Sequence, residues 1–184
     1  DLGAFTAFLY GFYQRELIYD IFETASGQRF HPSYTRVGGL LFDLNDVCIN
    51  KIRDFIKNFP KTHADIARLL NRNRIFIDRM RNVGVISVAD AINWGYTGPI
   101  LRSTGAPRDL RKDTPYLAYA ELDFEVPVGI KGDNYDRYYV RMREMDESVH
   151  MIRQLVEMLP EGPINVDDRR CTFPEKNLVY GEIE

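Results

Sequence analysis

The chain has 184 residues, of which 45% are hydrophobic, so it is long enough to form one compact domain with its own core. Its 27 acidic and 24 basic residues give a formal net charge of -3 and are mixed along the sequence, which excludes a basic groove for nucleic acid. Cys48 and Cys171 lie far apart and belong to no Cys-x-x-Cys pair. This argues against a structural zinc site or a disulfide framework and favours a reducing compartment.

The N-terminal stretch predicts an unusually apolar helix. Residues 2–13 contain no charged side chain, which is typical of a helix buried on most sides. The uncharged run is shorter than the roughly 20 residues that span a bilayer. Asp1 precedes it without an initiator Met or a targeting segment, so we interpret the chain as an internal piece of a longer, soluble protein.

Candidate functional residues lie at the two ends of this helix. Glu16, Asp20 and Glu23 form its polar stripe, and Gly27 ends it. A buried helix that begins with Asp1 and leads into His31 and Arg36 indicates proton or charge handling beside an apolar site. The ordinary alternative stays open, in which Asp1 caps the helix and His31 is a satisfied loop residue.

A short strand or extended turn is expected over residues 30–41, where Gly38 and Gly39 permit a close approach of two backbones. A second helix is predicted from Asn45 by apolar residues at steps of three and four, and Pro60 is expected to interrupt it. A third helix should cover residues 62–70, with His63 solvated in its first turn.

Short elements are expected in the middle of the chain. The arginines of residues 68–81 predict a solvated face or a subunit contact, and Ser87 with Asp90 resembles a capping box. Residues 93–99 are typical of turns, and the charged residues 108–112 suggest structural ion pairing. Alternation over residues 122–128 predicts a half-buried strand, which Pro127 places at an edge.

The longest helix is predicted up to residue 159, capped by Asp133 or Asn134. Its apolar positions recur at steps of four and three, which indicates one bundle seam: Tyr138, Met142, Met145, Val149, Ile152, Val156 and Leu159. We expect residues 1–160 to form the helical domain. Residues 161–184, rich in Pro, Gly and charge, should form an extended tail that wraps neighbouring subunits.

Common catalytic motifs are absent. The sequence holds no HExxH, serine nucleophile elbow, phosphate-binding loop or dinucleotide fingerprint, so a self-contained hydrolase or nucleotide enzyme is not indicated. From the residues alone, the chain is predicted to be mainly α with a few short strands, and its one buried helix is the candidate functional element.

Several motifs add a family resemblance: DLGAFT, RFHPSYTRVGGL, GYTGPILRSTG, DLRKDTPY, DFEVPVG and GDNYDRYYVRMREM. They resemble the D (49 kDa) subunit family of respiratory complex I, the NADH:quinone oxidoreductase whose subunit is related to the large subunit of [NiFe] hydrogenases. The resemblance implies a helical-bundle core of the hydrogenase large-subunit type. It also implies an enzyme subunit, a translocase component of the respiratory chain that is not active alone.

The resemblance assigns roles to three residues. Asp1, which opens DLGAFT, would take part in protonating the quinone, together with a His upstream of this sequence. His31 would be a proton-linked group near the terminal [4Fe-4S] cluster, and Arg36 an orienting or structural charge. A buried carboxylate or imidazole can change protonation when neighbouring charge changes, which agrees with these roles.

The resemblance also implies the surroundings of the chain. It would bind no cofactor or metal alone; quinone would be the substrate, the [4Fe-4S] cluster would sit in the partner subunit of the B (PSST) type, and NADH would bind elsewhere in the complex. Further partners would be subunits of the C (30 kDa) and H (ND1) types. The complex would lie peripherally on the cytoplasmic side of a bacterial inner membrane or the mitochondrial matrix side.

Two alternatives remain open. The chain could belong to a related membrane-bound hydrogenase or to an F420-linked or ferredoxin-linked oxidoreductase. It could also be a non-catalytic scaffold, in which case changing Asp1 and His31 would leave electron transfer unchanged.

Overall fold

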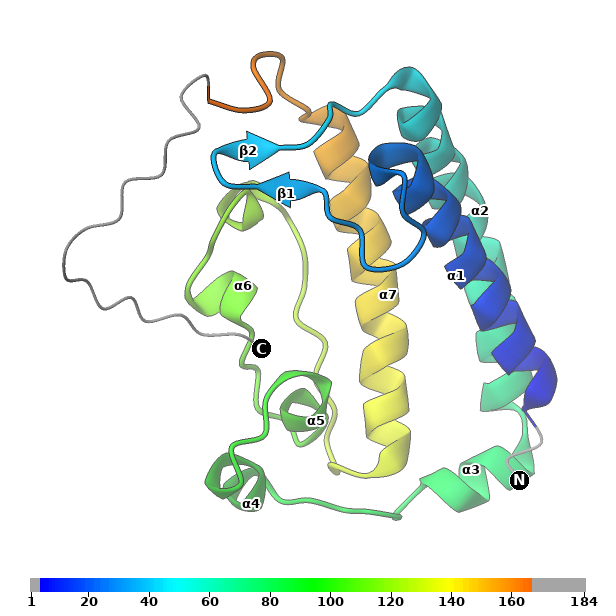
Figure 1. Ribbon diagram of the computed structural model, residues 1–184. Coiled ribbons are helices and arrows are strands. Elements are labelled where there is room, and N and C mark those ends of the chain that lie inside the picture. Colours follow the sequence, from blue (N-terminus) through cyan, green and yellow to red (C-terminus); the bar gives the residue numbers. More distant parts are fainter. Residues whose placement is uncertain (1–3, 167–184) are drawn as a thin grey trace.

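Three long helices dominate the computed structural model, which describes residues 4–166. They are α1 (Phe5–Ser26), α2 (Asp46–Asn71) and α7 (Asn134–Glu157). Figure 1 shows α7 between the α1 and α2 pair on one side and a segment of short helices on the other. The fold is mainly α with a few short strands, as the sequence predicts.

The remaining elements are short. They comprise β1 (Thr35–Arg36), β2 (Gly39–Leu40), α3 (Arg74–Met80), α4 (Val88–Asn93), α5 (Gly98–Ser103), α6 (Leu110–Asp113) and the 3-10 helix η1 (Tyr119–Glu121). The two strands form an antiparallel hairpin in which Thr35 faces Leu40 and Arg36 faces Gly39. The expected strand or turn over residues 30–41 is therefore confirmed.

Helix α2 differs from the prediction in two ways. It continues through Pro60 as one helix, because residues on both sides of the proline, Phe59 and His63, are buried and packing outweighs the lost N–H donor. His63 is consequently not in a solvated first turn. Its side chain is 10% exposed, and its Nδ1 lies 3.0 Å from Oδ1 of Asp146 on α7.

Helix α1 is much less buried within this chain than its apolar sequence predicts. Its described residues include only two that are buried, Ala7 and Gln14. One side of α1 packs on α2, where Leu17, Ile18 and Ile21 contact the core around Phe55. The aromatic side chains of its first half remain exposed, so this helix presents an apolar surface that α2 alone does not cover.

Residues 122–128 form no strand, contrary to the prediction. Leu122 and Phe124 are buried as the alternation requires, but the backbone pairs with side chains of α7. The N–H of Asp123 donates to Gln154 Oε1 at 2.9 Å, and Gln154 Nε2 donates to the Asp123 carbonyl at 2.7 Å. Because side chains satisfy this backbone, it stays extended without a partner strand.

Helix α7 buries two faces rather than the single predicted seam. Val149 packs with α1 and α2, whereas Met151 packs with Leu122 and Phe124 on the other side. The helix begins after Asp133, whose side chain accepts from the N–H of Asp136 at 2.8 Å, so the predicted cap is confirmed. Both sides of the fold therefore depend on α7.

A buried charge cluster joins α5 and α6 to α7. Arg102 Nε donates to Glu144 Oε1 at 2.7 Å, and Arg111 Nη2 donates to Asp109 Oδ2 at 2.6 Å. Burial alone would raise the pKa of the Asp109 carboxyl, but the hydrogen bonds and charge of Arg111 and the charge of Arg102 hold it below its ordinary value. The structural ion pairing expected for residues 108–112 is confirmed.

Candidate functional site

The hairpin after α1 is fastened to that helix by Arg29. Its guanidinium reaches all three acids of the predicted polar stripe, with N–O distances of 2.6 Å to Glu16, 2.5 Å to Asp20 and 2.9 Å to Glu23. The hydrogen bond to Asp20, followed by that to Glu23, raises the pKa of Arg29 above its ordinary value. The three acids thus fold residues 28–30 back along α1.

His31 directly follows the segment that folds back along α1. The Phe30 ring packs edge-on against Tyr19 of α1 with centroids 5.8 Å apart, and the His31 ring lies 4.1 Å from the Phe30 ring. His31 is exposed and has a φ of 52°, a left-handed conformation uncommon for a residue other than Gly. Such backbone outliers cluster at functional sites, so the φ of His31 supports a functional role for this residue.

Arg36 lies on β1 of the same hairpin. Its Nη1 donates to Ser33 Oγ at 2.5 Å and to its neighbour's carbonyl at Thr35 at 3.4 Å. Within residues 4–166 no carboxylate forms an ion pair with Arg36. His31, in the loop before β1, and Arg36, on β1, are therefore both exposed at the same end of α1.

The structure does not bring His31 next to the beginning of α1. Phe30 contacts α1 at Tyr19, 14 residues after Phe5. At a rise of 1.5 Å per residue, this corresponds to about 21 Å along the helix. Asp1, the other predicted site residue, lies outside the described residues. The first turn of α1 is thus separated from the Phe30 contact by most of the length of that helix.

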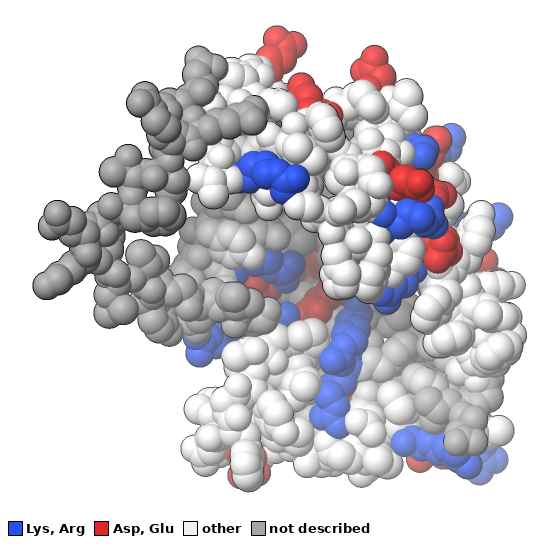
Figure 2. Space-filling view, in the orientation of Figure 1, with Lys and Arg blue, Asp and Glu red and all other residues white. Residues whose placement is uncertain are grey.

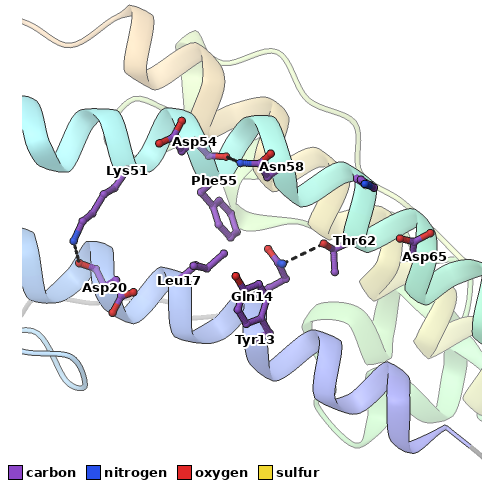
Figure 3. Close-up of a pocket in the computed structure, with 11 residues that line it drawn as sticks. Tyr13, Gln14, Leu17, Asp20, Lys51, Asp54, Phe55, Asn58, Thr62 and Asp65 are labelled. Atoms are coloured by element: carbon purple, nitrogen blue, oxygen red, sulfur yellow. Dashed lines mark hydrogen bonds between the residues drawn. The ribbon is translucent and has the colours of Figure 1, made fainter.

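A groove of about 490 Å³ runs between α1 and α2 (Figure 3). Leu17 and Phe55 supply apolar lining, and Lys51 and Asp20 lie at one end. Gln14 donates from Nε2 to Thr62 Oγ1 at 3.2 Å, while its buried Oε1 has no hydrogen-bond partner among the described residues. Sequence reasoning missed Gln14, although an amide directly after the uncharged run of residues 2–13 was a signal that a polar group would be buried there.

A second polar group that sequence reasoning missed lies under the hairpin. Tyr34 lines a cavity of about 380 Å³ together with Leu40 and residues 159–164. Its hydroxyl is buried and has no hydrogen-bond partner among residues 4–166. Burial, with a contribution from Asp43, raises the pKa of Tyr34. No pattern in the sequence distinguishes this tyrosine from the ten others in the chain.

The surface of α1 divides into two parts. Figure 2 shows charged residues gathered where the second half of the helix meets the hairpin, whereas residues 5–13 at its beginning carry no charge. The exposed side chains there are large and apolar or aromatic: Phe5, Phe8, Leu9, Tyr10, Phe12 and Tyr13. An exposed patch of this kind marks an interaction surface. No helix among residues 4–166 is both long enough and apolar enough to cross a bilayer.

Comparison with known proteins gives the family. The family model described as "Respiratory-chain NADH dehydrogenase, 49 Kd subunit" matches residues 1–184. The D subunit of NADH-quinone oxidoreductase from Pelobacter propionicus is 57% identical over 184 residues, covering 100% of this chain and 46% of the relative. The D subunits from Rickettsia bellii and Akkermansia muciniphila are 48% and 47% identical over 100% of this chain, covering 47% and 44% of their own lengths.

The chain spans a little under half the length of these curated relatives. The match runs through the apolar helix, the hairpin with His31 and Arg36, and the whole of α7. This chain belongs to the family of the 49 kDa subunit of the respiratory-chain NADH dehydrogenase.

Proposed function

We propose that the chain is part of a subunit in the peripheral arm of a proton-translocating NADH:quinone oxidoreductase. Together with the subunit that carries the terminal [4Fe-4S] cluster, it would form the chamber in which quinone is reduced and protonated. The observation that carries this proposal is the family match over all 184 residues. The name of the relatives, as D subunits of an NADH-quinone oxidoreductase, supplies the reaction.

In this proposal Asp1 and His31 are proton-linked groups and Arg36 orients charge in the same region. Reduction of quinone to quinol needs two protons as well as two electrons, so the chamber must contain groups that change protonation. Imidazole is the side chain most often used to relay protons in proteins, and His31 presents one at an exposed position. The guanidinium of Arg36, on β1 of the hairpin that follows, would favour anionic groups beside it.

The partners in this proposal are other subunits of the complex: the terminal [4Fe-4S] subunit of the B (PSST) type and subunits of the C (30 kDa) and H (ND1) types. The exposed aromatic face of α1 supports an assembled state, since Phe5 is 73% and Phe8 56% exposed in this chain. The complex would lie peripherally on the cytoplasmic side of a bacterial inner membrane or on the mitochondrial matrix side. The cluster would supply one-electron transfer to the quinone, and this chain would supply no cofactor ligand.

The experiment is Asp1→Asn in the full-length subunit of the assembled complex, with Asp78→Asn as the matched control. Asp78 is an exposed carboxylate on α3 whose partner, Arg74, is itself 92% exposed. We expect NADH oxidation with an artificial acceptor to survive in both variants. Quinone reduction should fall by about tenfold or more in Asp1→Asn alone, the scale of a lost proton-transfer group.

Unchanged quinone reduction in Asp1→Asn would contradict the assignment of Asp1 and favour the scaffold alternative. The hydrogenase alternative is not favoured, because the matching family is that of the NADH dehydrogenase subunit.

A further inference from the structure

Residues 164–166 run antiparallel to β2 and extend the hairpin by a third strand-like segment. We call these three residues the clamp. The N–H of Leu40 donates to the carbonyl of Ile164 at 2.9 Å, and the N–H of Val166 donates to the carbonyl of Gly38 at 3.0 Å. Gly39 and Asn165 face each other in an antiparallel bridge. The clamp thus meets the outer edge of β2, while β1 occupies its inner edge.

Gly39 is the position where the two backbones come closest. Its φ is +150°, and a Cβ added there would lie 2.2 Å from the carbonyl oxygen of Ile164 and 2.6 Å from Cα of Asn165. Both of these atoms belong to the backbone, so a side chain could be accommodated only if the clamp moved away. A glycine at this position is therefore required by the contact itself.

The clamp connects the hairpin to the helical core. It follows α7 through residues 158–163, and α7 packs against both α2 and α5. The hairpin itself has only two facing residue pairs, too few to be stable alone. On the other side, the Phe30 ring packs on Tyr19 of α1, and the Arg29 ion pairs with α1 join side chains that are 41–57% exposed. The backbone bonds to the clamp are the more direct link between the hairpin and the core.

We propose that the clamp positions the hairpin that carries His31 and Arg36, and that Gly39 and Asn165 are positioning residues for quinone reduction. This inference rests on the proposed function of the hairpin. The physical reason is that groups in a reaction chamber must be held within a fraction of an ångström of their working geometry. Backbone pairing with a segment anchored on α7 supplies that restraint to β2 and, through the strand pairs, to Arg36.

The test compares Gly39→Ala with Gly162→Ala, each in the full-length subunit of the assembled complex. Both glycines have nearly the same φ, +150° and +141°, so alanine meets similar backbone strain at the two positions. They differ in their surroundings, because a Cβ at Gly162 would meet nothing within 4 Å. A difference between the two variants therefore reports the contact with the clamp.

The first readout is amide hydrogen exchange. In Gly39→Ala the amide of Leu40, which donates to Ile164, should exchange about tenfold faster or more, because its bond is broken locally. The amide of Leu41, which donates to Tyr34 within the hairpin at 2.8 Å, should change less. Gly162→Ala should leave the Leu40 amide as it is.

The second readout is the ratio of quinone reduction to reduction of an artificial acceptor. In Gly39→Ala this ratio should fall by about tenfold, the scale expected for misplaced reacting groups, and in Gly162→Ala it should stay the same. The pH dependence of the midpoint potential of the terminal cluster should also weaken in Gly39→Ala, since a displaced His31 would couple less to that cluster.

Val166→Pro provides a second route if Gly39→Ala does not assemble. It removes the N–H that donates to Gly38 and places its ring carbon Cδ against that carbonyl, so we expect the same changes without any substitution at Gly39. An unchanged rate of hydrogen exchange at the Leu40 amide in Gly39→Ala would contradict the pairing of β2 with the clamp. Faster exchange with an unchanged ratio and pH dependence would overturn its positioning role, and a fall of the ratio in His31→Gln would then show that the proposed function still holds.

Discussion

Arg29 and Arg102 each bind carboxylates of a neighbouring helix, but they do so in different surroundings. Arg29 holds three acids of α1 at the surface, with its own side chain 41% exposed. Arg102 holds Glu144 of α7 with its side chain only 6% exposed. Exposed ion pairs contribute little to stability, whereas removing one partner of a buried pair leaves a charge without compensation. The packing of α5 and α6 on α7 is therefore stabilised by buried ion pairs, whereas the ion pairs of Arg29 beside the candidate site are exposed.

The largest effect is expected for Arg102→Ala. It would leave Glu144 and the fully buried Asp109 without this cation and remove the bond from Nη1 to the carbonyl of Arg108. We expect the free energy of unfolding to fall by about 3–5 kcal/mol, measured by urea unfolding of the purified chain. Arg141→Ala is the control, because Arg141 is exposed and donates to a carbonyl of its own helix. A loss no larger than that of the control would contradict the comparison.

Asp109→Asn should have the next largest effect, of about 2–3 kcal/mol at neutral pH, because a charged acceptor for Arg111 is lost. The pKa of Asp109 is lowered in the folded state, so its contribution is present above the ordinary value of 3.8 and is lost as the pH falls through the folded value. Urea midpoints recorded at decreasing pH should therefore show a smaller acid-induced loss in Asp109→Asn. Parallel pH profiles for the two proteins would refute this assignment.

Asp146→Asn should have a smaller effect. Its partner His63 is buried, but the Asp146 side chain is 43% exposed and water screens the pair. We expect a loss of about 0.5–1 kcal/mol by urea unfolding, reduced at high salt. A loss as large as that of Arg102→Ala would show that the exposure of one partner does not control the strength of the pair.

Arg29→Ala should have the smallest effect on unfolding, with no measurable change at high salt, because all of its contacts are exposed. Its consequence should instead be local. Amide exchange of residues 28–31 should increase, since the guanidinium folds these residues back along α1. A large fall in the unfolding midpoint would mean that surface charge fastens the hairpin more strongly than we infer.

The sequence predicted features that depend on nearby residues. The caps at Ser87 and Asp133 form as expected, since each side chain accepts from an N–H three residues later. A short strand or extended turn over residues 30–41 was also predicted, and Gly38 and Gly39 in it both have positive φ. The polar stripe of α1 was recognised, but the single cation that joins its three acids was not.

Features that depend on distant contacts could not be predicted. Pro60 stays inside α2 because Phe59 and His63 pack into the core, which the sequence of one helix does not reveal. Residues 122–128 alternate like a strand, yet their backbone is satisfied by Gln154 and Glu147 of α7. Helix α5 (Gly98–Ser103) begins within residues 93–99, which were interpreted as turns. The sequence predicted that the first half of α1 is buried, but it is exposed in this chain. It would be buried only if another protein segment covered it.

For the candidate site, local motifs indicated His31 and Arg36, and the structure places both at the surface, His31 in the loop before β1 and Arg36 on β1. Their proposed action on quinone, like that of Asp1, requires the assembled complex, so the sequence of this chain alone does not reveal it. The clamp on Gly39 could not be found from the sequence, because residues 164–166 lie more than a hundred positions away and carry no strand pattern.

The most direct test of the central claim compares His31→Gln with His150→Gln in the assembled complex. Both histidines are exposed, but His150 lies on α7, where its only ion-pair partner among the described residues is Asp123 at 3.9 Å. The quantity to measure is the rate of NADH-driven quinone reduction divided by the rate with an artificial acceptor. We predict that this ratio falls severalfold in His31→Gln and is unchanged in His150→Gln. An unchanged ratio in both variants would contradict the claim that this hairpin serves quinone reduction.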